Sequence, residues 1–147
     1  MRYIKIFEDF EENIQFSQLI GEIINEIYIS YSEDNIYFVT DNEVHNFYTQ
    51  NDCCNTVWFN HLNGVDDVIH QIVRSVESKD WSEADDYEGK SGDVIEACMW
   101  TLNTNRGRLD IEVRNSHNGY YGGSVGHNII KIEDFRKGDF KLVIDDF

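Results

Sequence analysis

The chain has 147 residues and a formal net charge of −16 at pH 7, from 28 acidic and 12 basic residues. With 41% hydrophobic residues it can bury the core of one domain, which distinguishes it from a disordered chain. No run of about 18 apolar residues is present, and the first residues lack the layout of a signal peptide. We therefore expect one domain over residues 1–147, located in the cytoplasm, where its three cysteines would stay reduced.

The predicted elements are mostly strands, because apolar and polar residues alternate along much of the chain. After a short candidate helix at 16–23, strands are predicted at 22–31, 35–40, 43–50 and 55–62. A short helix with two acids in its first turn is predicted at 64–73. The polar stretch 77–93 is predicted to be a long surface loop. The last predicted strands are 93–104, 108–115, 124–132 and 140–147.

Two local signals indicate antiparallel pairing. In the stretch RLDIEVRN at 108–115, Leu109, Ile111 and Val113 point to one face of a strand and the charged residues to the other. Asp41-Asn42 stands between two predicted strands and suits a hairpin turn. The sequence thus predicts a single β-rich α+β domain, a mostly antiparallel sheet of about six to eight strands with one or two short helices.

The acidic residues are unevenly distributed. No Lys or Arg occurs between Lys5 and Arg74, whereas 13 acids do, and the rest of the chain is nearly balanced. Repulsion among uncompensated carboxylates destabilises a compact fold. Two interpretations remain open: a charge that serves solubility, and a negative face for a basic partner.

Direct nucleic-acid binding and membrane binding are not expected. Both need clustered Lys and Arg to neutralise phosphates. The bases of the second half of the chain, such as Arg106, Arg114 and Lys137, are scattered among acids.

The adjacent cysteines Cys53 and Cys54 invite a search for a metal or redox site. Neighbouring residues of a strand point to opposite faces, so the pair cannot easily chelate one ion. Asp52 would raise the pKa of a neighbouring thiol, which disfavours a nucleophile. We therefore predict that the cysteines fill core, and no metal ligand or cofactor is predicted.

The stretch NSHNGYYGGSVGHN at 115–128 is rich in glycine. A phosphate-binding loop would be followed by a helix, but a strand is predicted here, and Asn118-Gly119 is a strong hairpin signal. No catalytic motif of the hydrolase or nucleotide-binding type occurs. We expect a turn between two strands and no enzymatic activity.

Three short motifs together resemble a family of uncharacterised domains from bacteria and their phages. They are Asp52-Cys53-Cys54, the segment GVDDVI at 64–69 and Asn118-Gly119-Tyr120-Tyr121, in the family's order. The resemblance covers about 19–125 and leaves 126–147 as a C-terminal strand extension. It implies a small β-rich domain and a phage or mobile-element context, without an activity.

By analogy with small acidic phage proteins, this context suggests a non-enzymatic inhibitor of a host defence nuclease, of the anti-CRISPR or anti-restriction type. Surface carboxylates would mimic nucleic acid and bind a basic partner such as a CRISPR effector. The predicted contact residues are Glu8, Asp9, Glu11, Glu12, Glu33, Asp34, Asp41, Glu43, Glu83, Asp85, Asp86 and Glu88.

The alternative hypothesis is a β domain that binds a small ligand or a metal. Its site would gather side chains from the two motif regions at one rim of the fold. The candidates are Cys53, Cys54, His61, His117 and Tyr120.

Overall fold

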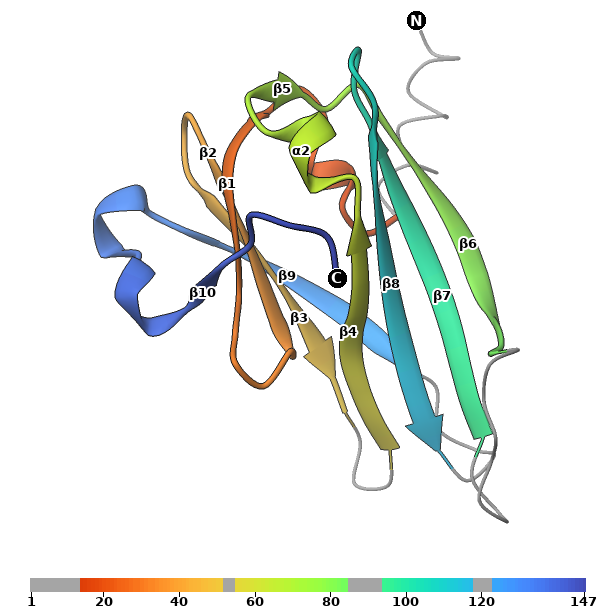
Figure 1. Cartoon of the computed structure of the whole chain (residues 1–147). Helices are drawn as coiled ribbons and strands as arrows, with labels where there is room; N and C mark the ends of the chain where they lie inside the picture. The colour runs from red at the N-terminus through yellow and green to blue at the C-terminus, as the bar shows by residue number, and fades with distance from the viewer. Residues whose placement is uncertain (1–13, 52–54, 85–93, 118–122) are drawn as a thin grey trace, which may run out of the picture.

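Two antiparallel β-sheets make up the computed structural model, which describes residues 14–51, 55–84, 94–117 and 123–147 (Figure 1). The six-stranded sheet has the order β10-β1-β2-β3-β9, with β5 paired to β1. Its strands are β1 (Ile23–Ile29), β2 (Asn35–Thr40), β3 (Val44–Gln50), β5 (Gln71–Ile72), β9 (Ser124–Ile130) and β10 (Lys141–Leu142). The four-stranded sheet has the order β4-β8-β7-β6, from β4 (Asn55–Asn63), β6 (Ser75–Glu83), β7 (Val94–Asn103) and β8 (Arg108–His117).

The hydrophobic core lies between the two sheets. Ile27 and Phe38 enter it from the six-stranded sheet, and Phe59 and Ile111 enter it from the four-stranded sheet, each fully buried. Burying one such side chain stabilises the fold by about 1.5–3 kcal/mol. Because alternate residues of a strand face the same side, this shared core fixes which face of each strand is exposed.

Phe16 closes the core from the N-terminal side. Its ring stacks on Phe47 of β3 with the ring centroids 4.1 Å apart, and lies 5.2 Å from the ring of Trp100 of β7. The 3-10 turn η1 (Ser17–Leu19) follows and buries Leu19. The segment before β1 therefore contacts both sheets.

A second apolar cluster covers the outer face of the six-stranded sheet. Tyr28, Tyr37 and Val44 form its base, and Phe135 and Phe140 pack on it. These phenylalanines flank the 3-10 turns η2 (Ile132–Asp134) and η3 (Lys137–Asp139). The outer face of this sheet is thus protected by the chain's own C-terminal segment.

Most predicted strands are confirmed, but the fold is mostly β rather than α+β. The predicted helix at 64–73 is wrong beyond its first turn, since α2 (Val65–Val68) ends where His70 adopts a positive φ of 66°. Gln71 and Ile72 then pair with β1 as β5. The predicted loop at 77–93 is also wrong in its first part, because Ser75–Glu83 is the edge strand β6.

The predicted strand at 140–147 is shorter than expected. Only Lys141 and Leu142 form a strand, after which the N–H of Val143 donates to the carbonyl of Ile27 (2.8 Å). The chain then crosses to the other sheet, where Phe147 and Leu62 exchange two backbone hydrogen bonds of 3.0 and 2.9 Å. The C-terminal segment therefore joins the two sheets. Among the described residues, no helix has the length and apolar character needed to cross a bilayer.

Candidate functional site

The predicted contact acids do not form one continuous surface. Glu33 and Asp34 lie in the turn between β1 and β2, whereas Asp41 and Glu43 lie in the turn between β2 and β3. These turns are at opposite ends of β2, and six residues of strand span about 20 Å. Glu83 is on β6 of the other sheet. The predicted contacts outside the described residues are Glu8, Asp9, Glu11, Glu12, Asp85, Asp86 and Glu88.

Asp34 serves its own turn. Its Oδ1 accepts hydrogen bonds from Ser32 Oγ (2.5 Å), Ser30 Oγ (2.8 Å) and Asn35 Nδ2 (3.0 Å). The hydrogen bond from Ser32, followed by those from Ser30 and Asn35, holds the pKa of this carboxyl below its usual value. The carboxylate of Asp34 is therefore part of the structure of this turn, and its contact with a partner stays a prediction.

The acids from the region without Lys or Arg are nearly uncompensated by cations. Among the described residues 14–51 and 55–73, the one ion pair with a Lys or Arg joins Glu26 Oε1 to Lys137 Nζ (2.6 Å). The hydrogen bond from Lys137 lowers the pKa of Glu26. The other carboxylates of this region have no such cation within 4.0 Å among the residues described.

Several of these carboxylates gather at one end of the molecule, where β2 turns into β3 and α2 begins (Figure 1). Asn25 connects these elements, because its Nδ2 donates to Asp41 Oδ1 (2.7 Å) and its Oδ1 lies 3.3 Å from Nδ1 of His70. We call this region the acidic end. It comprises Glu22, Asp41, Glu43, Asp66 and Asp67.

A histidine pair, of which His45 is buried and His127 half-buried, adjoins the acidic end. His45 is on β3 and His127 is on β9, and Nδ1 of His45 lies 2.9 Å from Nε2 of His127. Nε2 of His45 lies 3.3 Å from Glu43 Oε1 and 3.9 Å from Glu22 Oε1. Burial lowers the pKa of His45, and burial together with His45 lowers that of His127. No prediction from the sequence included this cluster, although Glu43 and His45 have the two-residue spacing of one strand face.

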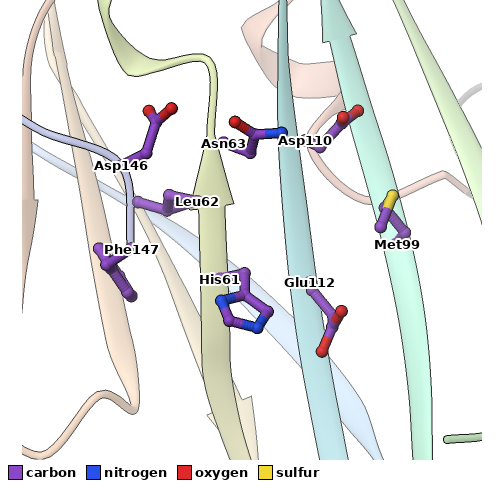
Figure 2. A pocket seen from close by; sticks show the side chains of 8 residues that line it. All are labelled: His61, Leu62, Asn63, Met99, Asp110, Glu112, Asp146 and Phe147. Atoms are coloured by element: carbon purple, nitrogen blue, oxygen red, sulfur yellow. The ribbon is translucent and has the colours of Figure 1, made fainter. Parts of the chain in front are cut away.

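A pocket of about 380 Å³ lies on the four-stranded sheet beside the C-terminal residues (Figure 2). His61 of β4 and Glu112 of β8 are register partners there, and Asp110 and Asp146 add carboxylates. Glu112 Oε1 accepts hydrogen bonds from Asn60 Nδ2 (2.9 Å) and Arg114 Nε (2.6 Å). Thr101 Oγ1 donates to Asp110 Oδ1 (2.7 Å). These side chains are thus held by neighbours within their own sheet.

Two of the three motifs of the resemblance have neighbouring residues that face each other across the four-stranded sheet. Asn55 follows the cysteine pair, His117 precedes Asn118, and the two are partners in the β4–β8 ladder. His117 Nε2 makes a short contact to Glu96 Oε1, and Asn55 Nδ2 donates to Asn115 Oδ1 (3.0 Å). The motif residues Asp52, Cys53, Cys54, Asn118, Gly119, Tyr120 and Tyr121 lie outside the described residues.

The two described candidates of the alternative ligand site, His61 and His117, do not lie together, and Cys53, Cys54 and Tyr120 are outside the described residues. His117 follows the inward alternation of β8 and is 7% exposed, whereas His61 is exposed and lines the pocket of Figure 2. Their partners in the ladder, Asn55 and Glu112, are far apart along it. The two histidines therefore face opposite sides of the four-stranded sheet. Cys98, a further cysteine, is buried, and burial raises the pKa of its thiol well above the usual range.

Comparison with known families gives a match over most of the chain. Residues 17–137 match a domain of unknown function, DUF7448. The comparisons with curated proteins and with solved structures gave no match. The matched region includes β9 and the turns that cover the six-stranded sheet, and so extends beyond the 19–125 expected from the motifs. The chain belongs to the DUF7448 family of domains of unknown function.

Proposed function

We propose that this chain is a non-enzymatic interaction protein that binds a basic partner through its acidic end. The observation that carries the proposal is the lack of Lys and Arg partners for the carboxylates of the acidic end among the described residues. Asp41, Asp66 and Asp67 are exposed, and they come from two elements whose backbones are fixed by the fold. Unpaired carboxylates at one end raise the local negative potential and steer a cationic surface toward it.

The partner class that fits this surface is a protein with a basic nucleic-acid channel, such as a CRISPR effector or a restriction enzyme. Carboxylates held by a fixed turn and a short helix can compete with phosphates for the same Lys and Arg side chains. The resemblance to domains of bacteria and their phages supports a setting in which such a nuclease is a target in the host cytoplasm. The partner, the inhibition and the location are all parts of the proposal.

Binding to a purified CRISPR effector nuclease and to a restriction enzyme, each with and without its nucleic acid, tests the proposal. We expect the chain to compete with nucleic acid and to lose affinity steeply as salt rises from about 0.1 M to about 1 M, where the Debye length shrinks from about 10 Å to about 3 Å. Affinity that is indifferent to salt, or binding that leaves nucleic-acid binding unchanged, would contradict nucleic-acid mimicry.

A further inference from the structure

The histidine pair and two carboxylates at the start of β1 and β3 have the arrangement of a metal site. The side chain of His45 is 3% exposed, and its Nε2 is buried without a hydrogen bond. This atom faces the carboxylates of Glu22 and Glu43, and one ligand atom of each of the three residues lies within 4.8 Å of the others. We propose that Glu22, Glu43 and His45 bind a divalent transition-metal ion, with Zn²⁺ as the best fit.

The imidazole of His45 is oriented by His127, which contacts the ring nitrogen on the side away from the carboxylates. The rings of His45 and His127 are inclined by only 22°, which suits a direct N–H···N hydrogen bond between Nδ1 of His45 and Nε2 of His127. The His127 ring is itself held against Phe47, with the centroids 4.7 Å apart. When Nδ1 donates to His127, the lone pair of Nε2 points at the two carboxylates. Metal-binding histidines are typically held in this way, by a partner at the other ring nitrogen.

The carboxylates are also held in place. Asn42 Nδ2 donates to Glu22 Oε2 (2.9 Å), which leaves Glu22 Oε1 for the site. The backbone of Glu22 is fixed between Leu19 and Val73 by hydrogen bonds of 2.9 and 3.0 Å. Thr40 Oγ1 donates to the carbonyl of Glu43 (2.9 Å) and accepts its N–H (3.2 Å). Both acids therefore enter the cluster from rigid backbone.

The spacing suits Zn²⁺. Ligands about 2.1 Å from a tetrahedral ion lie about 3.4 Å from each other. The 3.3 Å from Nε2 of His45 to Glu43 Oε1 matches this separation, and the 3.9 Å to Glu22 Oε1 needs only a small movement. An imidazole nitrogen favours zinc over Mg²⁺, which prefers oxygen ligands in an octahedron.

The negative charge of the three side chains and their access to solvent also suit a cation. Two carboxylates and a neutral imidazole carry a charge of about −2, which a divalent ion neutralises. Among the described residues, no Lys or Arg forms an ion pair with Glu22 or Glu43. The side chains of Glu22 and Glu43 are 18% and 32% exposed, so an ion can enter from solvent and keep a water as its fourth ligand.

Titration calorimetry of the full chain with Zn²⁺ alone and with Mg²⁺ alone tests the site. We expect saturable binding of one Zn²⁺ per chain and no comparable binding of Mg²⁺. Glu43→Gln and Glu22→Gln remove ligands at partly exposed positions and should weaken zinc binding more than tenfold. His127→Leu removes the orienting partner and should weaken it about 10- to 100-fold.

Matched controls keep the test specific. His70→Asn and Glu77→Gln change an exposed histidine and an exposed acid outside the cluster and should leave zinc binding unchanged. In an NMR spectrum of the imidazole rings, zinc should shift the Nε2 resonance of His45 and leave that of His70 in place. The proposal is overturned if zinc binding does not saturate, if the Glu43→Gln variant binds zinc as tightly as the wild type does, or if zinc binding depends on Cys53 and Cys54 instead.

Discussion

Glu33 and Phe59 join the two sheets through one backbone hydrogen bond. The N–H of Phe59 in β4 donates to the carbonyl of Glu33 in the β1–β2 turn, with an N···O distance of 2.8 Å. Glu33 adopts a positive φ of 62°, a left-handed conformation that costs a residue with a side chain about 1–2 kcal/mol. The exposed carboxylate of Glu33 is thus placed by a backbone conformation that the contact between sheets requires.

Replacing Glu33 should therefore separate backbone strain from charge. Glu33→Gly and Glu33→Val remove the same carboxylate, but glycine adopts this φ freely and a β-branched residue does not. We expect the glycine variant to exceed the valine variant in free energy of unfolding by about 1–2 kcal/mol. Urea denaturation of both variants measures this difference. Equal stabilities would show that the turn relaxes and that the link to Phe59 does not need the left-handed conformation.

Asp34→Ala should destabilise the β1–β2 turn. It removes the carboxylate that accepts hydrogen bonds from Ser30, Ser32 and Asn35. Hydrogen bonds to a charged group contribute about 1.5–3 kcal/mol to stability, and the contribution is smaller at a partly exposed site such as this one. The pKa of Asp34 is lowered from its ordinary value of 3.8 in the folded protein. Its charge therefore stabilises the fold above the unfolded-state pKa, and this contribution is lost as the pH falls through the lower folded-state pKa.

The measurement for Asp34 is urea denaturation of the wild type and the variant from neutral pH to below pH 3.8. The stability difference should be largest near neutral pH and should shrink once the carboxyl is protonated. A difference that stays constant across this range would mean that the charge of Asp34 contributes nothing.

Gly64→Ala should be among the most destabilising single substitutions in the chain. Gly64 has a φ of 102°, and a Cβ atom there would lie 2.0 Å from the carbonyl oxygen of Arg108. The backbone of β8 cannot move away without disturbing its ladders with β4 and β7. The backbone strain at residue 64 and the steric overlap of its Cβ with Arg108 would therefore both destabilise the fold. We expect a loss of about 2–4 kcal/mol. Gly107→Ala is a useful comparison, because its Cβ would meet the side chain of Asp67, which can move more easily.

The strands could be predicted where one face is buried. Along β8 the inward residues from Leu109 to Val113 are apolar and the outward ones are charged, so the alternation is visible in the sequence. The edge strand β6 has no such signal, because it is exposed at most positions and is held by its pairing with β7. The helical spacing at 64–73 gave a wrong prediction of a helix. His70 adopts a left-handed conformation that ends the helix, and Gln71 and Ile72 then pair with β1.

The candidate sites depend on pairings that the sequence does not show. The acids of the first half could be found by their lack of neighbouring Lys and Arg, but the hairpins decide that Glu33 and Asp34 lie at one end of β2 and that Asp41 and Glu43 lie at the other. Glu43 and His45 are close in sequence, whereas Glu22 and His127 join them only through the sheet, in which β9 pairs with β3 and β1 is separated from β3 by β2. The structural role of Asp34 could not be predicted, because its hydrogen-bond donors, Ser30, Ser32 and Asn35, are ordinary turn residues.

The acidic end binds the partner through the position of its carboxylates, and the overall net charge of the chain does not account for the binding. The most direct test of this claim is the affinity for the nuclease of two variants that each lose three negative charges. One variant carries D41N, D66N and D67N at the acidic end, and the other carries E133Q, D134N and D139N on the exposed C-terminal segment. We predict that the first loses affinity about tenfold or more, about 1.4 kcal/mol, and that the second binds nearly as the wild type does. Equal losses in the two variants would contradict the claim.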